Sequence, residues 1–132
     1  FSPDGKLLAS ASWDRIKLCS TETWAEVSTL HVHTFCVAFS PDGKLIASSA
    51  SDDETVKVWS TETWAEVATL HGHSDQLKSV AFSPDGKRLA LASGDDGVKL
   101  WWTETLERAT LHGHSRYVTS VAFSPDSKLL AS

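Results

Sequence analysis

The stretch Val80-Ala-Phe-Ser-Pro-Asp-Gly-Lys87 recurs along the whole chain. Residues 37–44 are identical to it, and residues 121–128 differ only by Ser127 in the place of glycine. The chain also opens on the end of the same stretch, at residues 1–6. The copies lie about 40 residues apart, a period typical of solenoids and propellers that stack one supersecondary unit.

Each copy has the pattern of a strand that runs into a tight turn. Val80, Ala81 and Phe82 end an apolar run. The next four residues, 83–86, place proline second and glycine last, as a type I turn prefers. Because another apolar segment follows at once, the repeat is predicted to be built around a β-hairpin.

Composition excludes several classes of function. The net charge is −5, and the 12 basic residues are scattered, whereas nucleic-acid binding needs a clustered basic surface. There is neither an apolar run of about 18 residues nor a signal peptide, so we expect no membrane partner and a cytoplasmic location.

Cys19 and Cys36 occupy unrelated positions in the repeat and indicate free thiols in a reducing compartment. The lack of methionine indicates a processed, engineered or excerpted chain.

Alternation of apolar and polar residues predicts an all-β protein of thirteen strands without a helix. Residues 62–67 could form one helical turn, but the β-branched residues around them favour a turn followed by a strand. The predicted strands are 7–12, 16–19, 24–30, 35–39, 45–51, 55–59, 64–70, 77–82, 89–93, 98–102, 107–111, 117–123 and 128–132.

The second strand of each unit is rich in alanine and serine, as in residues 7–12 and 45–51. Near-continuous small residues suit a strand that is packed on both faces, whereas a half-solvated strand would carry charges at alternate positions. The pattern therefore favours sheets stacked face to face as radial blades over an open sandwich.

These motifs resemble the WD40 repeat: Gly72-His73, then Phe82-Ser-Pro-Asp-Gly86, and Asp53 or Asp95 shortly before Trp59 or Trp101. The resemblance covers the whole chain and implies β-propeller blades of four antiparallel strands, in a partial or oligomer-completed propeller. It divides the chain into an incomplete blade (1–30), two blades (31–70 and 71–111) and the start of a further blade or a closing strand (112–132).

The chain departs from the family pattern in places. No repeat ends in Trp-Asp, because these positions hold Cys19-Ser20, Trp59-Ser60 and Trp101-Trp102. His31-Val-His33 also stands where the family has His-Gly-His. We therefore expect the first two blades to be less regular than the third.

In the family, a buried network joins a histidine, a serine or threonine, an aspartate and a tryptophan. The resemblance carries these roles to His33, Asp53, Trp59 and one of Ser48, Ser49 or Ser51 in one blade. It carries them to His73, Ser93, Asp95 or Asp96, and Trp101 in the next, and to His114 at the end. Such a chain of donors and acceptors can be buried when every group is paired.

Two other chemistries are conceivable for these residues. A set of serine, histidine and aspartate suggests a hydrolase, but here the set recurs in successive units and has no Gly-x-Ser-x-Gly motif. The six histidines form pairs two residues apart, which could bind a metal, but no local cysteine or carboxylate completes four ligands. We expect a structural role for these residues, with no catalytic site, metal or cofactor.

Residues that deviate from the repeat are candidates for a specific binding surface. In WD40 proteins, the turn before the structural aspartate and the start of the innermost strand face one rim, where partners dock. Tryptophan, tyrosine and arginine are common anchors of interfaces, although single exposed aromatic side chains are also normal. The candidate rim residues are Trp13, Arg15, Phe35, Gln76, Trp102, Arg116 and Tyr117.

Two functions remain open. The first is a non-catalytic scaffold that binds another protein. The alternative is an engineered or recently amplified propeller fragment whose only activity is self-assembly with further copies or blades. The near-identity of residues 20–27 and 60–67 indicates duplication or design and is compatible with both.

Overall fold

The computed structural model describes residues 1–50, 54–72, 75–94 and 97–132. Within these ranges it has thirteen strands and no helix, as the sequence predicted. The strands are β1 (Leu7–Ser12), β2 (Arg15–Ser20), β3 (Glu26–Leu30), β4 (Val37–Phe39), β5 (Leu45–Ala50), β6 (Thr55–Ser60), β7 (Glu66–Leu70), β8 (Leu77–Phe82), β9 (Arg88–Ser93), β10 (Gly97–Trp102), β11 (Arg108–His112), β12 (Ala122–Phe123) and β13 (Leu130–Ala131).

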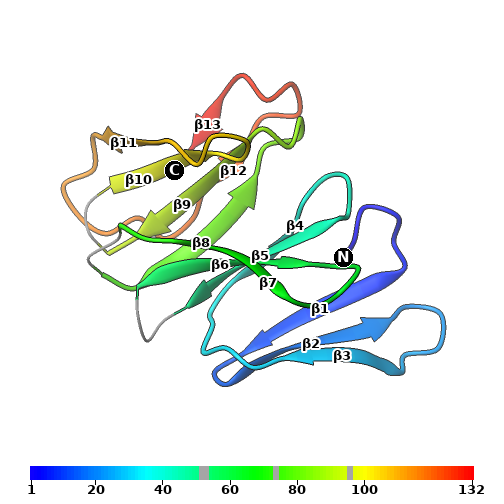
Figure 1. Cartoon of the computed structure of the whole chain (residues 1–132). Helices are drawn as coiled ribbons and strands as arrows, with labels where there is room; N and C mark the ends of the chain where they lie inside the picture. Colours follow the sequence, from blue (N-terminus) through cyan, green and yellow to red (C-terminus); the bar gives the residue numbers. More distant parts are fainter. Residues whose placement is uncertain (51–53, 73–74, 95–96) are drawn as a thin grey trace.

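Neighbouring strands pair antiparallel and in chain order, which produces successive sheets. The first sheet is β1-β2-β3, the second β4-β5-β6-β7 and the third β8-β9-β10-β11, while β12 and β13 form a short fourth sheet. Figure 1 shows the sheets side by side along the chain, with β1–β3 at one end and β12–β13 at the other. Four-stranded antiparallel units of this kind confirm the predicted blades.

The turn of the repeated stretch is held by its own serine and aspartate. The Gly86 N–H donates to the Ser83 carbonyl oxygen at 2.8 Å, which closes the predicted turn. Gly86 has a φ of 72°, a region that glycine enters without steric cost. The Ser83 hydroxyl donates to Asp85 Oδ1 at 2.5 Å and accepts from the Arg88 N–H at 2.9 Å. The same serine–aspartate bond occurs at residues 2–4, 40–42 and 124–126.

In each of the first three sheets, a threonine in the next turn at the same end bonds to this hairpin turn. Thr103 Oγ1 donates to the Gly86 carbonyl oxygen at 2.8 Å. Thr61 and Thr21 donate in the same way, to the carbonyl oxygens of Gly43 and Gly5. Both turns at this end of each sheet are therefore fixed to one another. Residues 62–67 form a turn followed by the start of β7, as predicted.

The second strands of the central sheets are buried on both faces, which confirms that the sheets are stacked. All residues from Ile46 to Ala50 in β5 and from Leu89 to Ser93 in β9 are buried. One apolar cluster joins the first and second sheets, a second cluster joins the second and third, and a third cluster covers the far side of β9 and β10. A strand in this position exposes neither face, so it needs small residues on both.

Strand register differs between the sheets. A shift interrupts the pairing of β2 with β3 at Leu18/Cys19, and of β6 with β7 at Val58/Trp59. The equivalent pair β10–β11 is in continuous register. The third sheet has its shift instead between β8 and β9, at Leu77/Ser79, so each of the first three sheets has one shift and the register does not show the third to be more regular. Cys19 and Cys36 are both free and partly buried.

Ser127, the residue that replaces glycine in the last copy of the turn, links two sheets. It keeps the left-handed backbone, with a φ of 61°. Its hydroxyl accepts a hydrogen bond from the Asp85 N–H at 3.0 Å. Its carbonyl oxygen accepts one from Arg88, whose guanidinium also lies 5.5 Å from the ring centre of Phe123. The serine side chain thus adds one hydrogen bond between the third and fourth sheets that glycine could not make.

We expect the turn aspartates to make stability depend on pH. The serine hydroxyl that donates to each carboxylate lowers the pKa of Asp4, Asp42, Asp85 and Asp126, assisted by a backbone N–H. Since the folded-state pKa is depressed, this stabilisation is complete above the ordinary aspartate pKa of about 3.9. It is lost as pH falls through the lower folded-state value.

Asp85→Asn should therefore reduce the loss of unfolding free energy between about pH 5 and pH 2, measured by urea denaturation at a series of pH values. Glu22→Gln removes one charge outside these turns and is the control. An identical pH profile for Asp85→Asn and the wild-type protein would contradict the prediction.

Candidate functional site

In the second sheet, the structure separates the three serines that the sequence left as alternatives. Trp59 Nε1 donates to Ser48 Oγ at 3.0 Å, and both side chains are buried. Ser49 Oγ points to the other face and accepts from the backbone N–H groups of Phe35 and Cys36, at 3.0 and 3.2 Å. Ser48 is therefore the partner of the tryptophan, whereas Ser49 fixes the segment before β4. Ser51 lies outside the described residues.

The remaining network residues are only partly described. Asp53, His73, Asp95 and Asp96 lie outside the described residues. Ser93 and Trp101 are buried in the third sheet. His33 is partly buried at the edge of the second sheet. His114 is exposed, with Nε2 2.7 Å from Ser132 Oγ.

Two predicted rim aromatics from different sheets meet. Trp13, in the turn between β1 and β2, lies edge-on to Phe35, with ring centres 5.4 Å apart. Its ring centre is also 6.0 Å from that of His33. Trp13 remains 64% exposed and Phe35 43% exposed, so the contact leaves most of both aromatic surfaces open to a partner.

A lysine that sequence analysis missed extends this surface to the third sheet. Lys78 Nζ lies 6.0 Å from the ring centre of Phe35, within the range of a cation–π contact. Its ammonium also donates to Gln76 Oε1. Lys78 and Tyr117 line an open hollow of about 390 Å³ together with Asp75 and Gly94. The one feature of the sequence that could have identified Lys78 is its place at the start of a strand, two residues after the predicted rim residue Gln76.

Arg15 is held beside Trp13 by its neighbour. Its Nε donates to Asp14 Oδ2 at 2.8 Å. The guanidinium lowers the pKa of Asp14 to about 2, so this carboxylate stays charged at neutral pH. Both side chains are well exposed, so the pair contributes little to stability but fixes the direction of Arg15.

Two of the predicted rim residues lie elsewhere or apart from these contacts. Trp102 pairs with Arg88, at the start of β9. At the other end of β9, Ser93 pairs with Leu77, the residue that follows Gln76. Trp102 therefore lies at the opposite end from Trp13 and Phe35. Arg116 is exposed beside Tyr117.

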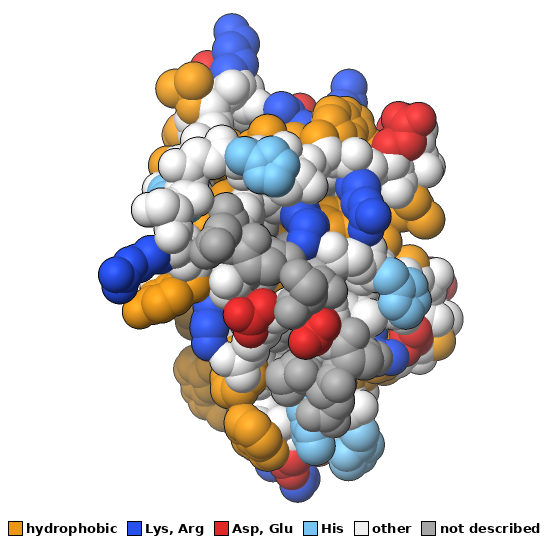
Figure 2. Space-filling model, turned by 90° about the vertical axis from the view of Figure 1, so that its left-hand side faces the viewer, with side chains coloured by type: hydrophobic (Ala, Val, Ile, Leu, Met, Phe, Trp, Pro, Cys, Tyr) orange, Lys and Arg blue, Asp and Glu red, His pale blue; other side chains and the backbone are white. Residues whose placement is uncertain are grey.

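We call Trp13, His33, Phe35, Lys78 and Tyr117 the aromatic rim. These residues lie in the turn between β1 and β2, the segment before β4, the start of β8 and the segment after β11. Figure 2 looks onto this end of the molecule, where hydrophobic, basic, acidic and histidine side chains are mixed around the grey residues. The surface is therefore amphipathic, which is typical of an interface that forms between separately folded proteins.

Metal-binding clusters and membrane-spanning helices are both absent from the described residues. Within them, no three His, Cys, Asp or Glu side chains form a group that could hold a metal ion. They also contain no helix with the length and hydrophobicity needed to cross a membrane.

Comparison with known proteins agrees with the fold. The family profile described as "WD domain, G-beta repeat" (WD40) matches residues 1–16, 24–60, 64–101 and 106–132. The chain belongs to the WD40 repeat family. None of the curated proteins compared with it matches. A solved structure of U3-55K is similar, with a TM-score of 0.84 and 27% sequence identity over 91% of this chain. The chain spans 40% of the length of that protein.

We expect Ser48→Ala to destabilise the protein by about 1–3 kcal/mol, because it leaves the buried Trp59 N–H without its acceptor. Urea denaturation at neutral pH measures the loss. The matched control is Ser10→Ala, since Ser10 holds the equivalent position in the first sheet, where it is exposed and Cys19 replaces the tryptophan. Equal stability of the two variants would show that the hydrogen bond contributes nothing.

Proposed function

We propose that the chain is a protein-interaction scaffold whose binding surface is the aromatic rim. The supporting observation is the contact of Phe35, in the segment before β4, with Trp13 in the turn between β1 and β2 and with Lys78 in β8. Interfaces concentrate their energy in a few aromatic and basic side chains, and this group offers both kinds on a rigid support. Membership of a family of interaction scaffolds supports the same role.

Ser48 and Ser49 are in positions that suit a structural role rather than a catalytic one. Ser48 is committed to the Trp59 indole, and Ser49 to two backbone N–H groups. Neither hydroxyl is oriented by a histidine, as a nucleophilic serine would need. Both lie on β5, between two apolar clusters, where a substrate has no access. We therefore assign these groups to the stability of the sheets.

Substitution of the rim tests the proposal. The double variant Trp13→Ala/Tyr117→Ala should no longer capture a protein that the wild-type chain captures. Each substitution removes a large, exposed aromatic side chain from the aromatic rim. The control is Trp24→Ala, because Trp24 is 65% exposed and lies in the turn between β2 and β3, at the end opposite Trp13. Capture should survive this change. Loss in both variants, or in neither, would contradict the assignment of the rim.

A second candidate function is assembly with further copies or blades. In the described residues, β1 is an edge strand of its sheet, whereas the equivalent strands β5 and β9 are covered by β4 and β8. An uncovered strand edge is a template for pairing with another chain. Exposed Phe1 and Leu129 add apolar surface to the two end sheets.

Light scattering distinguishes this second function from the first. If association completes the sheets, the chain should form a defined oligomer at micromolar concentration. The oligomer should persist in the Trp13 and Tyr117 variant, because edge pairing does not use the rim. A stable, well-folded monomer would exclude assembly as the function.

A further inference from the structure

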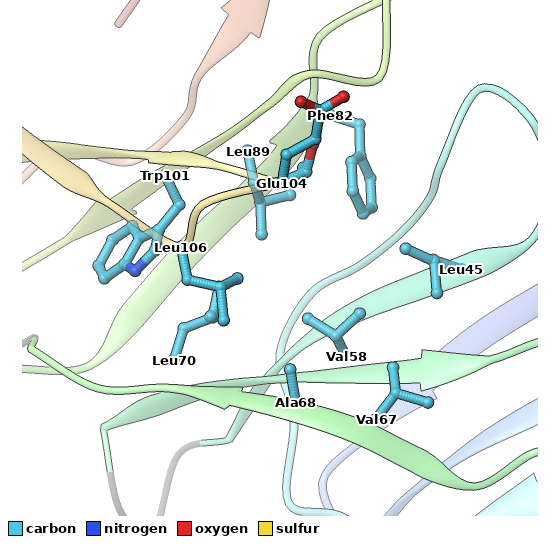
Figure 3. A pocket seen from close by; sticks show the side chains of 11 residues that line it. Leu45, Val58, Val67, Ala68, Leu70, Phe82, Leu89, Trp101, Glu104 and Leu106 are labelled. Carbon is cyan, nitrogen blue, oxygen red and sulfur yellow. The ribbon is translucent and has the colours of Figure 1, made fainter.

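An apolar cavity opens between the second and third sheets, away from the aromatic rim. Its volume is about 260 Å³. Figure 3 shows Val58, Val67 and Leu45 on one side and Phe82, Trp101 and Leu106 on the other. The Glu104 carboxylate lies at its edge, beside Phe82. Most of the residues that line the cavity belong to the apolar cluster that joins the two sheets or pack against it, so the cavity lies at the edge of this cluster.

The junction between the first and second sheets shows which side chain occupies the position equivalent to this cavity. There the turn after β6 carries Trp64, which packs against the cluster of Leu18, Leu30 and Trp59. Leu106 is the equivalent residue in the turn after β10, but it is 54% exposed and lies outside the corresponding cluster. One junction is therefore closed by an indole of the chain itself, whereas the other has only a leucine.

The two turns have the same backbone, so the difference lies in the side chain. Trp64 and Leu106 have φ values of 59° and 56°. Each donates its N–H to the carbonyl oxygen four residues earlier, that of Ser60 or Trp102, at 2.9 Å. An aromatic side chain entering beside Leu106 would contact the same kinds of residue that Trp64 contacts.

The size and charge of the cavity indicate the occupant. Cavities that bind whole small molecules usually have about 300–1,000 Å³, so this one is suited to a single large side chain. Glu104 is the only charged residue among the described residues that line it, and none of the ion pairs within this part of the chain involves its carboxylate. A basic residue next to the inserted side chain would complete the pair at the edge of the cavity.

We propose that the cavity beside Leu106 is a docking site for a tryptophan side chain of a partner protein, followed by a basic residue. The indole takes the place that Trp64 occupies at the other junction, and the basic residue pairs with Glu104. This site is separate from the aromatic rim and does not depend on it.

The test uses the peptide acetyl-tryptophanyl-lysine amide, titrated into the isotope-labelled chain and followed by NMR of the Leu106 and Val67 methyl groups. These signals should shift, and the analogues with leucine for tryptophan or glutamate for lysine should bind at least about tenfold more weakly. Equal binding of the three peptides would overturn the proposal.

Two matched variants exploit the internal comparison. Leu106→Trp should fill the cavity, abolish peptide binding and raise the melting temperature, because Trp64 already adopts this backbone conformation. Trp64→Leu should open a second cavity and raise the stoichiometry from one peptide to two. Unchanged binding by Leu106→Trp would overturn the site.

Two further variants test the carboxylate and the identity of the occupant. Glu104→Gln, an exposed change that should not affect folding, should reduce the preference for lysine over glutamate; an unchanged preference would overturn the role of the carboxylate. Trp24 of a second copy is the competing occupant. If the methyl shifts appear on raising the concentration of the chain alone and vanish in Trp24→Ala, the site is a self-association contact and the proposal of a partner protein is wrong.

Discussion

Each central sheet of this protein must be covered on both faces, and the remaining features follow from this requirement. The middle strands β5 and β9 expose neither face, so no single sheet can be stable alone. The apolar clusters between sheets supply the stabilisation, because burial of apolar surface is the main force that opposes chain entropy. Polar groups inside the stack must then be paired internally, as Ser48 and Trp59 are.

The fold could be predicted from the sequence because the same strand and turn motifs occur several times in the chain. The turn at residues 83–86 and the small residues of the second strands have a local physical cause, and both were placed correctly. The choice between Ser48 and Ser49 could not be made, since adjacent residues on a strand face opposite sides and either could have met the indole. Only the three-dimensional register of β5 against β6 decides it.

The candidate site was less accessible to such analysis. Trp13 and Phe35 were identified as deviations from the repeat, but their mutual contact and the position of Lys78 depend on how neighbouring sheets are placed. Trp102 deviates from the repeat just as clearly and lies at the other end. The exchange of Trp64 for Leu106 was visible in the sequence, yet its meaning required the cavity that it leaves. Deviation from a repeat thus marks a position without assigning its role.

Ser127 illustrates the same point for anyone who redesigns such proteins. Averaging the repeats would restore glycine at this position, since the other copies carry it, and the left-handed backbone would accept the change. The averaged chain would nevertheless lose the hydroxyl that receives the Asp85 N–H from the neighbouring sheet. A consensus sequence therefore improves the single unit at the expense of the joint between units, and idealising this chain would weaken it where its sheets meet.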